Sequence, residues 1–194
     1  MNPNLARNAT FTALDFETTG HVRNQRCLPW QLGLAEGGQG TIQRTHMLFL
    51  CVPADFHFNP YAPGRWAEKR ELLAASPSLQ ESWPELAPWL SERYLVSHNA
   101  PVERKMLQEN FPLHAFPLWL DTLKIARTVY PRMKSYALEA LLDSLNLTSS
   151  VEAACPELAP HDALYDAVGC LTLLYHILSL DGWSEVSCDY LASL

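Results

Sequence analysis

The stretch "FTALDFETTG", residues 11–20, has the alternation of a β-strand but carries two acids. A period of two places Asp15 and Glu17 on the same face as Phe11. Ionised carboxylates are costly to bury, and two of them a few ångströms apart repel unless a proton or cation lies between them. D-x-E is frequent by chance, but Mg²⁺ prefers such oxygen ligands, and α/β folds bind ligands near strand C-terminal ends. The stretch therefore predicts a buried strand that ends at a metal site.

The chain on either side predicts a mixed sheet covered by helices. Residues 28–38 and 44–52 have the pattern of two further strands, joined by a glycine-rich turn. Strands are also expected at 93–98 and 117–120. Three strands followed by strands that alternate with helices are typical of an α/β fold with a mixed, here five-stranded, sheet. Helices are expected at 66–74, 78–86, 101–110, 121–130 and 135–147, and in a long segment that starts near residue 162.

Length and composition favour one cytoplasmic domain. The 194 residues are enough for a substantial core, which we place at about 10–180 of a single domain 1–194, with a short C-terminal tail at 181–194. Five widely spaced cysteines without a C-x-x-C pair argue against disulfides and against a zinc site. The first ten residues lack the apolar core of a signal peptide. The formal charge of −7 argues against a protein that coats duplexes, but it allows an enzyme that grips a strand end.

Residues 163–180 form an apolar segment that is about long enough to span a bilayer. The segment contains Asp166 and His176, and a polar, aromatic tail follows it. We therefore expect a helix buried in the protein core, with no membrane association.

Asp166 is the anomaly of this last helix. Its stripe carries the small residues Ala163, Gly169 and Cys170, which would let a neighbouring backbone approach closely. An acid on an apolar helix needs a partner, and a shared metal would be one. The alternative is a capping role at the helix N-terminus, although Asp162 fits that role better.

Two further segments have a structural and a functional interpretation. His161 precedes the last helix and could point at the same place as Asp166, although a lone histidine is more often structural or exposed. In "SHNAPVERKML", Asn99 resembles an N-cap, Pro101 suits a first turn, and Glu103 is favoured there by the helix dipole. This structural account alone would explain the second segment.

Taken together, the motifs "DFETTG", "SHNAPVERKML", "DTLKIAR", "SYALEALL" and "HDALYDA" resemble a known family in order and spacing. The chain looks like a DnaQ-like 3′–5′ exonuclease of the DEDDh group over about residues 10–180. Within that group, "KIARTVYP" and "LDGWS" look most like the exonuclease X branch. The resemblance implies a ribonuclease-H-like fold, with helices on both faces of the five-stranded sheet.

The resemblance also implies an activity, which is the release of nucleoside 5′-monophosphates from single-stranded or frayed 3′ ends of DNA or RNA. It implies two Mg²⁺ ions, with Mn²⁺ as an alternative ion. His161 matches the general base that accepts a proton from the attacking water. The metal-binding acids match Asp15, Glu17, Glu103 and Asp166, the turn at the terminal nucleotide matches Thr18, Thr19 and Gly20, and Asn99 matches the asparagine that shapes the strand-to-helix turn of the second motif.

Glu103 departs from the family pattern, because the group normally has aspartate at this position. A displacement of about 1 Å at a catalytic group can lower a rate on the order of 100-fold. Glutamate remains a competent oxygen ligand, so we expect an active enzyme, with a lowered rate or a Mn²⁺ preference as alternatives. The competing interpretations are a catalytically impaired module that only binds nucleic-acid ends, and a ribonuclease T-like or oligoribonuclease-like RNA exonuclease. His21, which follows the motif where an apolar residue is usual, is a smaller departure.

Overall fold

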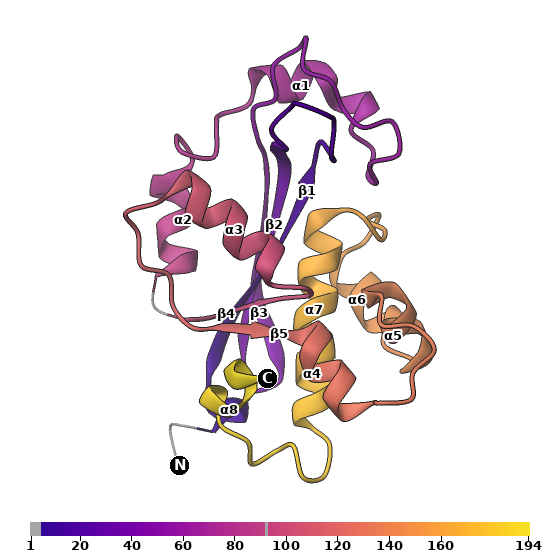
Figure 1. The fold of residues 1–194 in the computed structure, drawn as a ribbon. Coiled ribbons are helices and arrows are strands. Elements are labelled where there is room, and N and C mark those ends of the chain that lie inside the picture. Colours follow the sequence, from indigo (N-terminus) through magenta and orange to yellow (C-terminus); the bar gives the residue numbers. More distant parts are fainter. Residues whose placement is uncertain (1–4, 92) are drawn as a thin grey trace.

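A computed structural model describes residues 5–91 and 93–194, and in it five strands form one mixed sheet (Figure 1). The strand order is β3-β2-β1-β4-β5. The β1–β2 and β2–β3 pairs are antiparallel, whereas β4 runs parallel to both β1 and β5. The expected α/β architecture, with three antiparallel strands followed by alternating strands and helices, is confirmed.

The bounds of the elements agree with the sequence pattern to within a few residues at most strands. The strands are β1 (Thr10–Thr18), β2 (Pro29–Gly38), β3 (Thr41–Phe49), β4 (Tyr94–Ser97) and β5 (Trp119–Asp121). The helices are α1 (Arg70–Ala75), α2 (Trp83–Leu90), α3 (Pro101–Asn110), α4 (Thr122–Val129), α5 (Leu138–Ser144), α6 (Thr148–Ala154), α7 (Ala163–Leu178) and α8 (Cys188–Ser193). Two short 3₁₀ helices lie at Ala6–Asn8 and Ala67–Lys69.

The two faces of the sheet carry separate cores, as the alternation along β1 predicts. Phe11 and Ala13 belong to a cluster formed with α4, α5, α6 and α7. Leu14 and Phe16 belong to a second cluster, which includes side chains of α2 and α3. Helices therefore cover both faces (Figure 1). Burying apolar area on both faces is the main stabilising contribution, at roughly 25 cal/mol per Å².

Helix α7 lies against the sheet so closely that one strand residue must be glycine. A Cβ atom at Gly33 of β2 would come within 2.2 Å of the backbone of Ala163. Further along, Gly169 faces Leu142 of α5, and the Cys170 Sγ lies 3.3 Å from the Thr122 hydroxyl of α4. The small residues Ala163, Gly169 and Cys170 of α7 thus allow the close approach of β2, α5 and α4, as expected.

Several details differ from the expectations. The segment from 78 to 86 is helical only from Trp83, while α6 was not expected at all. Residues 181–194, expected as a tail, include α8, which contacts β5 and whose Cys188 and Leu191 are buried in the core. None of the helices in the described part of the chain is long and apolar enough to cross a membrane, and most of α7 is buried in the core as expected.

Candidate active site

The C-terminal end of β1 presents the two acids of the opening stretch. Glu17 is 4% exposed, and Asp15 is half-buried. In the antiparallel register Asp15 pairs with Gly33, and Glu17 pairs with Gln31. Paired residues of an antiparallel ladder point to the same face, so both acids face α7, whose first turn lies on Gly33.

The turn after β1 is held by its own side chains. The Thr19 hydroxyl is fully buried and accepts the Leu28 N–H at 3.0 Å, so it closes the loop between β1 and β2. The Thr18 hydroxyl accepts the N–H of Gly20 at 3.3 Å, and Gly20 has a positive φ of 71°. Thr18 also lines a surface hollow together with His21. The buried Thr19 hydroxyl thus has a structural role, whereas Thr18 lies on an open surface.

The loop before α7 brings His161 to the same place. His161 has a left-handed backbone, with φ of 68°, a conformation that costs a non-glycine residue about 1 kcal/mol or more. Its N–H donates to the Asp166 carboxylate at 3.1 Å. The cap of α7 comes from the sheet, because the Gln31 side-chain oxygen accepts the Ala163 N–H at 3.2 Å. Asp162 occupies the N-cap position but makes no side-chain bond to the helix.

Three of these side chains form one cluster. One ligand atom each from Glu17, His161 and Asp166 lies within 4.8 Å of the other two. Glu17 is buried, Asp166 is half-buried, and His161 is exposed. Two carboxylates and an imidazole at this spacing offer a divalent cation oxygen and nitrogen ligands.

Asp15 and Glu103 lie outside this triangle but within its electrostatic reach. Burial raises the pKa of Asp15, and the charges of Asp166, Glu103 and Glu17 raise it further. Glu103 is 4% exposed on α3, and its Oε2 atom finds no hydrogen-bond partner among the described residues. A buried carboxylate oxygen without a partner is unfavourable, and a cation would satisfy it.

The remaining carboxylates have shifted pKa values for the same reason. Burial, followed by the charges of Asp166 and Asp162, raises the pKa of Glu17 to about 8. Burial raises the pKa of Glu103 to about 8, although its own backbone N–H opposes the shift. Burial raises the pKa of Asp166 to about 6, against the lowering effect of the His161 N–H. Carboxylates that resist ionisation together are typical of a site built for positive charge.

The turn between β4 and α3 corrects one expectation. Asn99 is not the N-cap of α3; Ala100 occupies that position and makes no side-chain bond. Asn99 instead has a left-handed φ of 72°, and its N–H donates to the Asp121 carboxylate at 3.1 Å. Asparagine tolerates this conformation better than most residues, so Asn99 shapes the turn through its backbone. Pro101 occupies the first turn of α3, as predicted.

One proline-rich segment, residues 53–66, reaches both loops of the site. The Asn59 N–H donates to the Thr19 carbonyl at 2.8 Å, and the Asn59 amide donates to the His21 carbonyl at 3.1 Å. At the other end, the Arg65 guanidinium pairs with the buried Asp162 at 3.1 Å. We call residues 59–65 the strap, because it ties the turn after β1 to the loop of His161.

The strap continues through a glycine that packs tightly. Gly64 has a φ of 84°, and a Cβ there would lie 2.7 Å from the Trp30 ring and 3.1 Å from the His161 carbonyl. The Asp162 carboxylate that pairs with the strap also accepts the Ala159 N–H at 3.2 Å. The residues of the strap have no periodic pattern, so the sequence alone could not single them out. Gln31, a polar residue inside an apolar strand, was a visible signal of this part of the site.

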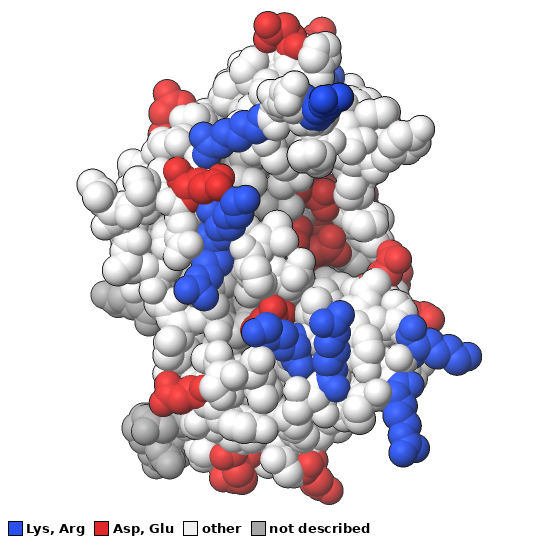
Figure 2. All heavy atoms as spheres, viewed as in Figure 1, with Lys and Arg blue, Asp and Glu red and all other residues white. Residues whose placement is uncertain are grey.

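Acidic side chains line a hollow of the surface between α3 and the start of α7 (Figure 2). Lysine and arginine side chains, with a few acidic ones among them, gather along the outer side of α3 and towards α4 (Figure 2). Acids thus lie inside the hollow, and exposed cations lie beside it.

Comparison with known proteins gives a family match for most of the chain. The family model described as "Exonuclease" matches residues 12–174. The PolC-type DNA polymerase III of Thermotoga petrophila is 28% identical over 153 residues, which is 72% of this chain and 10% of that protein. The 3′–5′ exonuclease DinG of Staphylococcus epidermidis is 24% identical over 140 residues, 70% of this chain and 15% of that protein. The chain thus spans roughly a tenth of the length of these curated relatives.

Solved structures share the fold along nearly the whole chain. Exonuclease X in complex with 5′-overhanging duplex DNA superposes with a TM-score of 0.71 at 24% identity, covering 94% of this chain and 98% of that one. The nuclease domain of 3′hExo, a DEDDh member bound to rAMP, has a TM-score of 0.73 at 14% identity, covering 93% and 96%. The expected ribonuclease-H-like fold is confirmed.

Proposed function

The chain belongs to the exonuclease family, and we propose that it is a metal-dependent 3′–5′ exonuclease that releases nucleoside 5′-monophosphates from nucleic-acid ends. The observation that carries the proposal is the cluster of Glu17, His161 and Asp166, within 4.8 Å of one another and next to the coupled acids Asp15 and Glu103. The polarity of hydrolysis follows the DEDDh resemblance of the motifs.

The residues present fit a divalent metal. Four carboxylates supply hard oxygen ligands. The Oε2 atom of Glu103 has no hydrogen-bond partner among the described residues, and a bound cation would compensate for this. We assign Asp15, Glu17, Glu103 and Asp166 as metal-binding residues, with Mg²⁺ or Mn²⁺ as the ion. When bound, such ions activate water and neutralise the charge that develops on the phosphate.

We assign His161 as the general base. Its ring is exposed, while its backbone is fixed by the bond to Asp166 and by the contact with the strap. A base of this kind accepts the proton of the attacking water, and the exposed side of the ring can pass that proton to solvent. We therefore expect His161→Ala to lower the rate of hydrolysis in Mg²⁺.

The turn residues hold the terminal nucleotide in this proposal. Thr18 lines the hollow beside the acids and is available to substrate, whereas Thr19 and Gly20 act through the backbone of the turn. Asn99 contributes by shaping the turn that carries Glu103 into the site.

The test is hydrolysis of 5′-labelled single-stranded DNA and RNA with Mg²⁺ or Mn²⁺. We expect a ladder of products shortened from the 3′ end, absent in EDTA and in Asp15→Asn. The same panel compares DNA with RNA as substrate. Binding without shortening would favour the end-binding module instead, and shortening that persists in Asp15→Asn would reveal a contaminating nuclease.

A further inference from the structure

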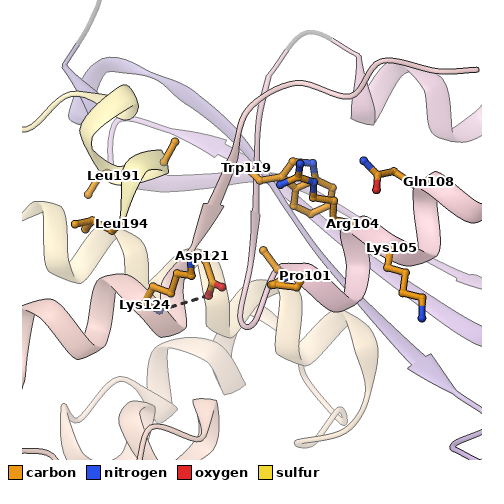
Figure 3. Close-up of a pocket in the computed structure, with 11 residues that line it drawn as sticks. Pro101, Arg104, Lys105, Gln108, Trp119, Asp121, Lys124, Leu191 and Leu194 are labelled. Atoms are coloured by element: carbon orange, nitrogen blue, oxygen red, sulfur yellow. Dashed lines mark hydrogen bonds between the residues drawn. The ribbon is translucent and has the colours of Figure 1, made fainter. Parts of the chain in front are cut away.

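A basic hollow of about 340 Å³ lies beside the candidate active site, between α3, β5, α4 and α8 (Figure 3). Its lining has no part in the chemistry proposed above. The residues that define this basic hollow here are Arg104, Lys105, Gln108, Trp119, Asp121 and Lys124.

The charge in the basic hollow is predominantly positive. Arg104 and Lys124 are exposed and form no ion pair within the described residues, and Lys105 has only a 3.8 Å contact with Glu109. The single acid, Asp121, already accepts backbone N–H groups of Asn99, Leu123 and Lys124. Among the side chains of the lining, three are cationic and one is acidic, and the acidic one is engaged elsewhere; Leu194, the last residue of the sequence, also lines the hollow.

The basic hollow adjoins a second hollow that reaches the active site. That second hollow, the Thr18 hollow, is lined by Thr18 at the end of β1, by His21 in the loop that follows, and by Val102 of α3. Pro101 and Lys105 line both hollows. A continuous tract thus runs from the turn after β1, across the N-terminal half of α3, to the cations.

We propose that the basic hollow binds the phosphodiester backbone of the nucleic acid beyond its terminal nucleotides. The inference rests on the proposed function, which places the 3′ end at the acids. Arg104 and Lys124 neutralise phosphates, and the half-buried Trp119 offers an indole face to a sugar or base. The phosphates come either from the 5′ side of the hydrolysed strand or from a complementary strand.

The test measures binding by the full chain without hydrolysis, in EDTA, by fluorescence anisotropy. Three labelled probes are compared: a trinucleotide, a single strand of about 20 nucleotides, and a duplex with a recessed 3′ end. The variant Arg104→Ala/Lys124→Ala is matched by Arg132→Ala/Lys134→Ala, which removes the same charge from exposed positions outside both hollows. Thermal midpoints verify that both variants fold.

The hollow variant should bind the long probes about tenfold more weakly than the control variant does. For two lost phosphate contacts, its slope of log affinity against log salt should fall by about 1.4 with the single strand and by about 1.8 with the duplex. The trinucleotide, too short to span the tract, should show less than about a twofold difference. Weakening confined to the single strand identifies the hydrolysed strand as the ligand, and weakening confined to the duplex identifies the complementary strand.

Equal weakening of binding in the two double variants would overturn the inference, because the effect would then be general electrostatics. Equal weakening for the trinucleotide and the long probes would also overturn it, because the contact would then lie at the strand end. Failure of the proposed function is separate. It would appear as wild-type protein that hydrolyses none of the probes in Mg²⁺ or Mn²⁺, whatever the anisotropy gives.

Discussion

The contact between β1 and α7 has two halves with opposite energetics. In one half Phe11 and Ala13 are completely buried and pack in the same cluster as Val168 and Leu171 of the helix. Two and four residues further along the same strand face, the helix meets acids instead, and Asp166 raises the pKa of both Asp15 and Glu17.

The difference separates what holds the fold from what performs the chemistry. The apolar half gains free energy from burial, and it fixes the register that sets the acids opposite the first turn of α7. The acidic half loses free energy in the absence of cations, because each carboxylate is desolvated beside others of the same sign. The fold tolerates the acidic half of this contact because the apolar half supplies the stability. The two halves should therefore respond in opposite ways to substitution.

Substitution in the acidic half should have the largest effect on activity. Asp166→Asn keeps the shape of the side chain but removes a charge from the cluster, so we expect turnover to fall on the order of 10³-fold. The measurement is single-turnover hydrolysis of a 5′-labelled strand in Mg²⁺. Asp189→Asn in α8 is the matched control, and retained activity in Asp166→Asn would remove that residue from the site.

Substitution in the apolar half should have the largest effect on stability. Phe11→Ala removes a completely buried ring that packs near Tyr175, so unfolding should become easier by about 3–5 kcal/mol. Urea denaturation measures the loss. Activity per folded molecule should stay within a fewfold of wild type at low temperature, and a loss comparable to that of Asp166→Asn would mean that the two halves are not separable.

The strap should have an intermediate effect, on activity more than on stability. Arg65→Ala removes the ion pair with Asp162, one residue from His161, so kcat should fall about tenfold with KM little changed. Arg65→Lys should recover part of the loss, and the exposed Arg23→Ala should have no effect. A rise in KM with kcat intact would mean instead that Arg65 binds substrate.

The pH dependence of stability without metal should show a smaller effect. The pKa of Glu17 and of Glu103 rises from 4.5 to about 8 on folding, and that of Asp166 rises from 3.8 to about 6. Between pH 5 and 8 the folded protein therefore binds more of these protons than the unfolded chain, and stability must decrease as pH rises. In EDTA we expect the thermal midpoint to fall as the pH rises from about 5.5 to about 8.5. Glu17→Gln should have a flatter profile, and an equally steep one would contradict the assignment.

The sequence predicted the parts of the site that depend on periodic patterns. The period of two along β1 placed Asp15 and Glu17 on one face, and the helical period of α7 singled out Asp166. The pairing of Arg65 with Asp162 could not be predicted from the sequence, because these two residues lie in irregular segments, 97 residues apart, that meet only in the folded chain. The N-cap assigned to Asn99 was wrong for a similar reason, since the Asp121 carboxylate of another strand holds that turn.

In our proposal the buried acids are tolerated because cations neutralise them, so the stability of the protein should depend on divalent metal. Thermal midpoints of the wild type and Asp15→Asn are measured in EDTA and in millimolar Mg²⁺ or Mn²⁺. We predict that the variant is the more stable protein in EDTA, by a few °C, because asparagine has no carboxylate that must be desolvated or protonated when the chain folds. We predict that metal stabilises the wild type and reverses that order, because the ion binds the folded site and hardly binds the unfolded chain. If neither Mg²⁺ nor Mn²⁺ changes the thermal midpoint of the wild type, this explanation is wrong, whether that midpoint lies below or above the midpoint of the variant.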